Sequence, residues 1–368
     1  MNVLITGGLG VNGSWVTRKL VERGIRPVVL DLRADFSLVG EDLVDRIDFV
    51  QGDIGDTELI AKSLADGHID AVVHMAAAVG HGAVDPDPKR TFDLNTYATV
   101  KLLEASRLAG VKRFVFTSSR AVYGAISGAH ASPNYAPIDE DHPLRPGTLY
   151  DSCKVSSESV GRAYEAAFGM AFVALRFSTI YGPGKTLRHN TFGVVSRIIE
   201  GAARGQRVVI ERGGDQKDDF IFADDAAEGV VLALLNEKRL PRSEYNISTG
   251  VLHSLHDVAR AVRKYFPDAS IEIGPGLNFF GNGPNYSGLL SNRRAVADLG
   301  LRAQADLDVT IDRYYEAMRR LRLGPFAAPT GNRSTAIEPR MRGAVAAITR
   351  IGRGSPLPKV ARVRPIKS

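Results

Sequence analysis

Along the first 177 residues, short apolar runs alternate with longer segments in which apolar residues recur every three or four positions. The short runs are rich in β-branched residues, which is typical of strands buried on both faces of a sheet. They predict strands at 3–6, 26–30, 48–51, 71–74, 113–118 and 172–177. The longer segments predict helices at 13–23, 57–65, 95–109 and 149–168. Strands that alternate with helices in this order predict an α/β fold whose parallel sheet is doubly wound, as in Rossmann folds.

The pattern becomes less regular after residue 182. It predicts a strand at 208–211 and helices at 192–203, 223–236 and 253–266. We therefore expect a smaller C-terminal α/β lobe that is partly interleaved with the sheet, so that residues 1–178 form the Rossmann domain and 219–250 return to it. The lobe would consist of residues 179–218 and 251–325. It would bind the substrate, because pockets commonly open between such a lobe and the carboxyl ends of the strands.

Composition adds that the chain should fold as a soluble globular protein. Hydrophobic residues make up 44% and charged residues 24%, both close to the average for this class. The single cysteine, Cys153, cannot form an internal disulfide, and no apolar run approaches the roughly 18 residues that a membrane span needs. The apolar opening at 1–5 is too short for a signal peptide. We expect a cytoplasmic protein.

Positive charge is concentrated in the last segment, 326–368. This segment holds nine Arg or Lys residues and one acid, Glu338, so its net charge is +8. Subtracting +8 from the whole-chain charge of +6 leaves −2 for residues 1–325. A slightly acidic body argues against nucleic-acid binding. The proline-rich basic segment is expected to be a flexible tail, with contact to an anionic membrane surface through residues 341–353 as the alternative.

A glycine-rich loop follows the first predicted strand and opens the first predicted helix. Its sequence, TGGLGVNG at 6–13, has glycines three residues apart. This spacing lets backbone N–H groups approach a pyrophosphate at the positive end of a helix. The loop therefore predicts a dinucleotide site whose cofactor-binding residues are Gly7, Gly10, Val11, Asn12 and Gly13.

Asp31 ends the second predicted strand, 18 residues after Gly13. A carboxylate there accepts hydrogen bonds from an adenosine ribose and repels a 2′-phosphate, so NAD is favoured over NADP. Arg33 leaves NADP open as the alternative, because its cation could receive the 2′-phosphate. Residues 1–178 are accordingly expected to be the NAD-binding domain.

Tyr150 and Lys154 lie four residues apart in the helix predicted at 149–168, so their side chains share one face. Lowering a tyrosine pKa from about 10 toward 7 needs roughly 4 kcal/mol, which a neighbouring ammonium and a cationic nicotinamide would supply. The hydroxyl residues at 117–119 end another predicted strand, which places them at the carboxyl edge of the sheet. A hydroxyl there can hold a substrate oxygen and share its proton with Tyr150.

These features together resemble the extended short-chain dehydrogenases/reductases, specifically the NAD-dependent epimerase/dehydratase family, over residues 1–325. The matching segments are TGGLGVNG at 6–13, DI at 53–54, HMAAA at 74–78, Asn95, TSSRAVYG at 117–124, YDSCK at 150–154 and LRFSTIYGPG at 175–184. In combination these motifs are highly specific.

The resemblance implies NAD as cofactor and a homodimer that pairs through the helices predicted at 95–109 and 149–168. It implies that the catalytic set is Ser119, Tyr150 and Lys154. Besides the loop, Asp31, Tyr150 and Lys154, the implied cofactor contacts are Asp53, Ile54, Met75, Ala76, Ala77, Asn95, Thr117 and Ser178. The implied substrate contacts are Ser119, Thr179, Arg188 and Asn190. No metal site is expected.

Three positions depart from the family pattern. Dehydratases carry an acidic residue where this chain has Arg120, so dehydration is disfavoured. Nucleotide-sugar epimerases usually carry Asn where this chain has Thr179, and a diphosphate-binding Arg where it has Asp218. A carboxylate there would repel a substrate diphosphate, which puts a standard UDP-sugar site in doubt. The cations that would have to compensate are Arg188, Arg212 and Lys217.

The combined pattern favours an NAD-dependent oxidoreductase or epimerase that oxidises a secondary alcohol of a sugar-like or small polar substrate. By the resemblance, Tyr150 would take the hydroxyl proton while hydride passes to the nicotinamide, and an epimerase would return the hydride on the other face. The leading specific alternative is a UDP-sugar 4-epimerase. An alternative of another class is a non-catalytic NAD-sensing regulator, against which the complete Ser119, Tyr150 and Lys154 set argues.

Overall fold

The computed structural model describes residues 1–78, 85–188, 193–281 and 283–327. Met1–Thr330 forms one compact unit. Most of the predicted tail, 328–368, lies outside the described residues, as does the predicted substrate residue Asn190. Within the described ranges, none of the helices combines the length and the apolar character needed to cross a membrane.

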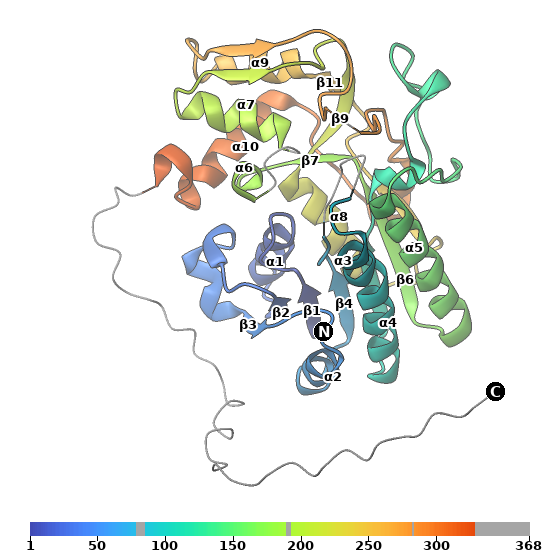
Figure 1. Cartoon of the computed structure of the whole chain (residues 1–368). Helices are drawn as coiled ribbons and strands as arrows, with labels where there is room; N and C mark the ends of the chain where they lie inside the picture. The colour runs from blue at the N-terminus through green and yellow to red at the C-terminus, as the bar shows by residue number, and fades with distance from the viewer. Residues whose placement is uncertain (79–84, 189–192, 282, 328–368) are drawn as a thin grey trace, which may run out of the picture. The chain divides into compact units, whose positions relative to one another are not determined.

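A seven-stranded parallel sheet forms the centre of this unit (Figure 1). Its spatial order is β10-β6-β5-β4-β1-β2-β3. The strands are β1 (Val3–Thr6), β2 (Val28–Asp31), β3 (Asp48–Gln51), β4 (Ala71–His74), β5 (Arg113–Thr117), β6 (Ala171–Phe177) and β10 (Glu244–Ile247). The predicted doubly wound parallel sheet is confirmed, and β10 joins the six earlier strands beside β6. The strand order reverses between β1 and β4, which is where such sheets bind nucleotides.

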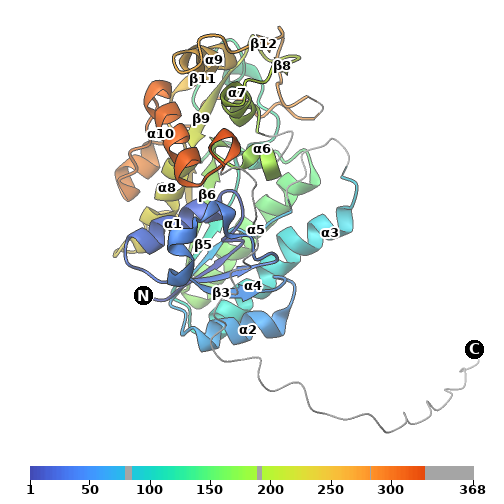
Figure 2. The same ribbon diagram turned by 90° about the vertical axis from the view of Figure 1, so that its left-hand side faces the viewer.

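Helices cover both faces of the sheet (Figure 2). On one face α1 contacts α8, and on the other α4 packs between α2 and α5. Their bounds are α1 (Gly13–Glu22), α2 (Thr57–Asp66), α3 (Pro88–Phe92), α4 (Ala98–Leu108), α5 (Leu149–Phe168) and α8 (Ala223–Leu235). A π-helical turn at Asp93–Tyr97 joins α3 to α4.

Several element boundaries differ from the predicted ones, and three of the differences have a clear physical reason. β2 begins two residues later than predicted, because Pro27 has no N–H to donate to the ladder. The helix predicted from residue 95 begins earlier, since the Asp87 side chain caps α3 and the chain then continues through the π-helical turn into α4. α9 begins at Leu255, because Ser254 and Asp257 form a capping box that fixes its start.

A smaller group of strands and helices lies beyond the carboxyl ends of the large sheet (Figure 1). Its strands are β7 (Thr179–Tyr181), β9 (Lys217–Phe222) and β11 (Leu252–Ser254) in one sheet, and β8 (Val208–Ile210) and β12 (Ile271–Ile273) in another. Its helices are α6 (Lys185–Arg188), α7 (Val194–Ala203), α9 (Leu255–Arg263) and α10 (Leu307–Arg320). Residues 219–222 belong to β9, so the return to the large sheet consists of α8 and β10. The division into a cofactor domain and a substrate lobe stays a prediction.

One hydrophobic core runs from the large sheet into this smaller group. Trp15 of α1 packs edge-on against Phe222 of β9, with ring centroids 5.4 Å apart. Tyr181 of β7 and Tyr314 of α10 belong to the same cluster, and each is at most 2% exposed. Because burying a large apolar side chain stabilises by about 1.5–3 kcal/mol, these contacts hold the smaller group firmly against the edge of the sheet.

Candidate active site

Two adjoining pockets lie along the carboxyl edge of the large sheet. The cofactor groove is the pocket lined by the glycine-rich loop, Asp31, Asp53, Ile54 and residues 75–78. The catalytic chamber is the pocket lined by residues 117–121, Tyr150, Lys154, residues 177–180, Lys185, Phe280, Pro284 and Tyr286, together with residues of α1 and α8. Asn12, Met75 and Ala77 line both pockets, so a long ligand can extend from one into the other.

The glycine-rich loop turns tightly at the start of α1. Gly7 has a φ of +69°, and a Cβ there would lie 2.7 Å from the Ala76 backbone N. A Cβ on Gly13 would lie 2.1 Å from the Gly7 carbonyl O, so the loop closes only with glycine. The first turn of α1 contains no acid and no side-chain cap from Asn12, which leaves N–H groups for an anion, and the buried Asn12 Oδ1 has no partner among the described residues. This geometry fits the diphosphate of NAD.

Asp31 faces the cofactor groove from the end of β2. Its Oδ2 accepts a hydrogen bond from the Leu9 backbone N at 2.9 Å, which joins the carboxylate to the glycine-rich loop. Arg33 is exposed and does not line the groove. An acid at this position, with Arg33 outside the groove, fits a ribose diol and not a 2′-phosphate, in agreement with NAD. Asp53 and Ile54 line the same groove.

Asn95 has a different task from the cofactor contact predicted for it. Its side chain makes two hydrogen bonds to the Ala78 backbone, accepting from the N at 2.9 Å and donating to the O at 2.8 Å. Its own carbonyl accepts from the Thr99 and Ser157 hydroxyls, at 2.9 Å each. Asn95 does not line either pocket. It therefore acts as a positioning residue that fixes the groove wall at residues 75–78.

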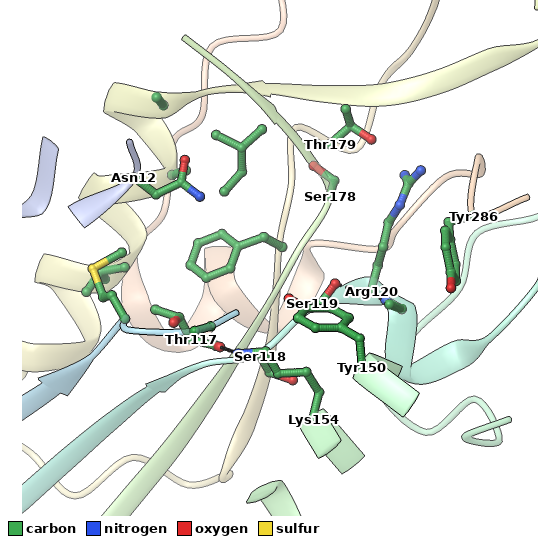
Figure 3. Close-up of a pocket in the computed structure, with 18 of the residues that line it drawn as sticks. Asn12, Thr117, Ser118, Ser119, Arg120, Tyr150, Lys154, Ser178, Thr179 and Tyr286 are labelled. Carbon is green, nitrogen blue, oxygen red and sulfur yellow. Dashed lines mark hydrogen bonds between the residues drawn. The ribbon is translucent and has the colours of Figure 1, made fainter. Parts of the chain in front are cut away.

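The three hydroxyls at the end of β5 point in different directions. The Thr117 Oγ1 donates to the carbonyl that ends β4, at 2.8 Å. The Ser118 Oγ donates to the buried Glu158 carboxylate of α5, at 2.5 Å. The Ser119 hydroxyl instead forms a hydrogen bond with Tyr150, which lies next to it in the chamber (Figure 3). Of the three, Ser119 is thus the one placed to act on a substrate.

Tyr150 and Lys154 project from the first turns of α5 toward the chamber (Figure 3). A capping box between Thr148 and Asp151 fixes where α5 begins. The Lys154 Nζ donates to the Thr117 carbonyl at 2.8 Å and lies 5.6 Å from the centroid of the Tyr150 ring. Burial lowers the pKa of Lys154 to about 8.

The pKa of Tyr150 differs in direction from the prediction. Within the protein, burial raises this pKa, the Asp151 carboxylate raises it further, and only the hydrogen bond with Ser119 among the main causes lowers it. The Lys154 ammonium, which was expected to lower it, is held by the Thr117 carbonyl. A phenolate at this position therefore depends on positive charge from a bound oxidised cofactor.

The lining residues that were missed in the sequence include Lys185, Phe280 and Tyr286. The Tyr286 hydroxyl donates to the Asp151 carboxylate, 3.0 and 2.9 Å from its two oxygens, and the Tyr286 ring packs in one cluster with Tyr150. Phe280 and Tyr286 lie in an irregular segment rich in Gly and Asn, which no local periodicity marks. Lys185 directly follows the LRFSTIYGPG motif, and this position in the sequence could have identified it as a residue of the site.

The departures from the family pattern meet in one cluster. Arg120 and Asp218 form a bidentate ion pair with N–O distances of 2.6 and 2.9 Å, and their side chains are 6% and 0% exposed. The Thr179 Oγ1 and the Gly288 backbone N also donate to Asp218, at 2.7 and 3.1 Å. The expectation of a bare carboxylate that repels a diphosphate is therefore wrong, because Arg120 neutralises Asp218.

Two of the cations considered as compensation, Arg212 and Lys217, do not line the chamber. Lys217 is exposed on β9, and the Arg212 guanidinium donates to a main-chain carbonyl at 3.1 Å. The side chain of Arg188 lies outside the described part of the chain, as does Asn190.

Most of the predicted site residues line the two pockets. In the cofactor groove these are Gly7, Gly10, Val11, Asn12, Gly13, Asp31, Asp53, Ile54, Met75, Ala76 and Ala77. In the catalytic chamber they are Thr117, Ser119, Tyr150, Lys154, Ser178 and Thr179. The Ser178 Oγ is buried without a hydrogen-bond partner among the described residues, so it is available to a ligand.

A doubly wound sheet with a glycine-rich loop at its switch point, and a serine, tyrosine and lysine at the carboxyl ends of its strands, defines an NAD-dependent enzyme of the extended short-chain dehydrogenase type. The sequence pattern of the NAD dependent epimerase/dehydratase family matches residues 3–248. The chain belongs to this family.

Several proteins resemble this chain in sequence or in fold. A putative UDP-glucose 4-epimerase of Methanocaldococcus jannaschii is 30% identical over 257 residues, which are 70% of this chain and 79% of the relative. The UDP-glucose 4-epimerase of Thermus thermophilus, solved in complex with NAD, is 27% identical with a TM-score of 0.71 and covers 86% of this chain and 99% of its own. The UDP-glucuronic acid 4-epimerase of Bacillus cereus, solved with UDP-glucuronic acid and NAD, is 25% identical with a TM-score of 0.73, over 87% of this chain and 100% of its own.

Proposed function

We propose that this protein is a 4-epimerase of a nucleoside-diphosphate sugar. The observation that carries the proposal is the convergence of Ser119, Tyr150 and Lys154 in one chamber that adjoins an NAD groove. The relatives and structural neighbours described above are UDP-sugar 4-epimerases, which favours this reaction over a general oxidation of small polar alcohols. The neutralised Asp218 removes the main objection to a diphosphate.

In this reaction Ser119 would hold the oxygen of the sugar C4 hydroxyl, and Tyr150 would accept its proton. When bound, NAD would supply the hydride acceptor and donor that epimerisation at C4 requires. Below its pKa of about 8, the Lys154 ammonium holds a positive charge near the Tyr150 ring. The chamber must also let the keto sugar rotate, so that its opposite face is presented for reduction.

Dehydration is not part of the proposal. Elimination of water needs an acid or base beside the catalytic serine, and this chain has Arg120 there. Its guanidinium is occupied by both oxygens of Asp218, so it cannot serve as that group.

The test is an assay of the NAD-loaded protein with UDP-glucose, in which the appearance of UDP-galactose is followed by NMR. We expect equilibration of the two sugars without net NADH formation. Tyr150→Phe should lower kcat by about 100- to 10,000-fold, the usual range for loss of a general acid or base, while the control Tyr265→Phe, which lies outside both pockets, should not. A parallel assay with UDP-glucuronic acid shows whether the enzyme acts on the neutral sugar or on the acidic one. Net NADH from a free polyol, with no epimer formed, would refute the proposal in favour of a dehydrogenase.

A further inference from the structure

The catalytic chamber is lined by three described cationic side chains, Arg120, Lys154 and Lys185. Arg120 is bound by both oxygens of Asp218, and Lys154 is held by a main-chain carbonyl. Lys185 forms no side-chain hydrogen bond or ion pair to any described residue. Of the three, it is the cation left for a ligand.

Lys185 is also deeply buried, with 7% of its surface exposed. Burial lowers its pKa to about 8, and no neighbouring carboxylate among the described residues acts against this shift. A buried ammonium without a partner is costly to the fold. Proteins commonly keep such an unfavourable group where a ligand supplies the opposite charge.

The main chain around the base of the Lys185 side chain is closely packed. A Cβ on the preceding Gly184 would lie 2.6 Å from the Leu38 side chain. A Cβ on Gly193 would lie 3.3 Å from the Lys185 Cβ. Neighbours at this distance leave little room for the base of the lysine to move.

From this arrangement we infer that Lys185 binds the diphosphate of the substrate, in a chamber where the Arg120 cation is already paired with Asp218. This inference rests on the proposed function, because that function supplies the nucleoside diphosphate. Lys185 lines the catalytic chamber and not the cofactor groove, which favours the substrate over NAD as the source of the anion.

The test measures UDP binding to the NAD-loaded enzyme by calorimetry, with inorganic pyrophosphate as a second probe. Lys185→Met should weaken UDP binding at least about tenfold, and Lys185→Arg, which keeps the charge, should stay within about threefold of wild type. The matched control is Lys217→Met, because Lys217 is an exposed lysine of β9 outside the chamber. Affinity for NAD should be unchanged in all three variants.

A stability measurement separates a ligand-binding role from a structural one. Replacing an unpaired buried charge by an apolar side chain should leave the melting temperature of the ligand-free protein equal or higher. A large fall in melting temperature in Lys185→Met would show that Lys185 supports the fold, and would overturn the inference. Loss of NAD affinity in this variant would overturn it too, because the anion would then be the cofactor's.

The inference and the proposed function fail in different ways. UDP binding that depends on Lys185, without epimerisation of any UDP-sugar, would refute the function and uphold the inference. Epimerisation of a UDP-sugar, with UDP affinity unchanged in Lys185→Met, would uphold the proposed function and refute the inference. A wild-type enzyme that binds neither UDP nor pyrophosphate at millimolar concentration would overturn the inference.

Discussion

At the scale of single residues, the pair of Arg120 and Asp218 shows how charge is balanced next to the reacting groups. Both side chains are almost fully buried, and Asp218 receives two further hydrogen bonds. Removing one partner of such a pair leaves the other charge buried without compensation. The pair therefore acts as a unit.

Arg120→Met and Asp218→Asn should each lower the free energy of unfolding by about 3–5 kcal/mol. The double variant should lose clearly less than the sum of the two, because it leaves no unpaired charge. Urea denaturation of the wild type, the two single variants and the double variant gives the coupling free energy between positions 120 and 218. The exposed pair of Arg207 and Glu272 is the control, and Glu272→Gln should leave the urea midpoint close to that of wild type. Strict additivity at 120 and 218 would refute the argument.

At the scale of elements, the sequence predicts six of the seven strands of the large sheet, because most of them are short apolar runs. It does not predict β10, whose sequence EYNI alternates polar and apolar residues. It predicts Ser119, Tyr150 and Lys154 because they follow a strand or share a helix face. It does not predict Tyr286, which reaches the site through an irregular segment. It also misjudged Asp218, since no local pattern shows a bidentate partner 98 residues away.

The helices α4 and α5 carry exposed apolar side chains that a partner could cover. Leu108 at the end of α4 is 70% exposed and Phe168 at the end of α5 is 54% exposed. We propose that the protein forms a homodimer through these helices. Leu108→Glu combined with Phe168→Glu should raise the dimer dissociation constant at least about tenfold in analytical ultracentrifugation, because charge is disfavoured in an interface core.

The control for this prediction is Val309→Glu, on α10, where the side chain is 42% exposed and lies outside α4 and α5. It should leave the dimer intact. A wild-type protein that sediments as a monomer at micromolar concentration would refute the dimer.

At the scale of the whole molecule, the buried His74 should set part of the response to acid. Its ring is bonded to Thr6 and Thr99, at 2.7 and 2.9 Å, and burial, with a smaller contribution from Lys154, lowers its pKa to about 3. Between about pH 6.5 and 3 the unfolded chain therefore binds a proton that the folded protein does not. Stability is lost as pH falls through this range.

At about pH 5 the loss from this one group should be about 2 kcal/mol, from about 1.36 kcal/mol for each pKa unit. In His74→Gln, the difference in unfolding free energy between about pH 7 and pH 5 should shrink by about that amount. The control is His256→Gln, since His256 is exposed on α9. Equal acid sensitivity of wild type and His74→Gln would contradict the prediction.

The ion pair of Arg120 and Asp218 has a consequence for how this branch of the family can change over generations. A cation at position 218 beside Arg120 would place two positive charges together in a buried site. Loss of Arg120 alone would leave the Asp218 carboxylate buried without a counter-ion. A tolerated change at either position therefore requires a matching change at the other.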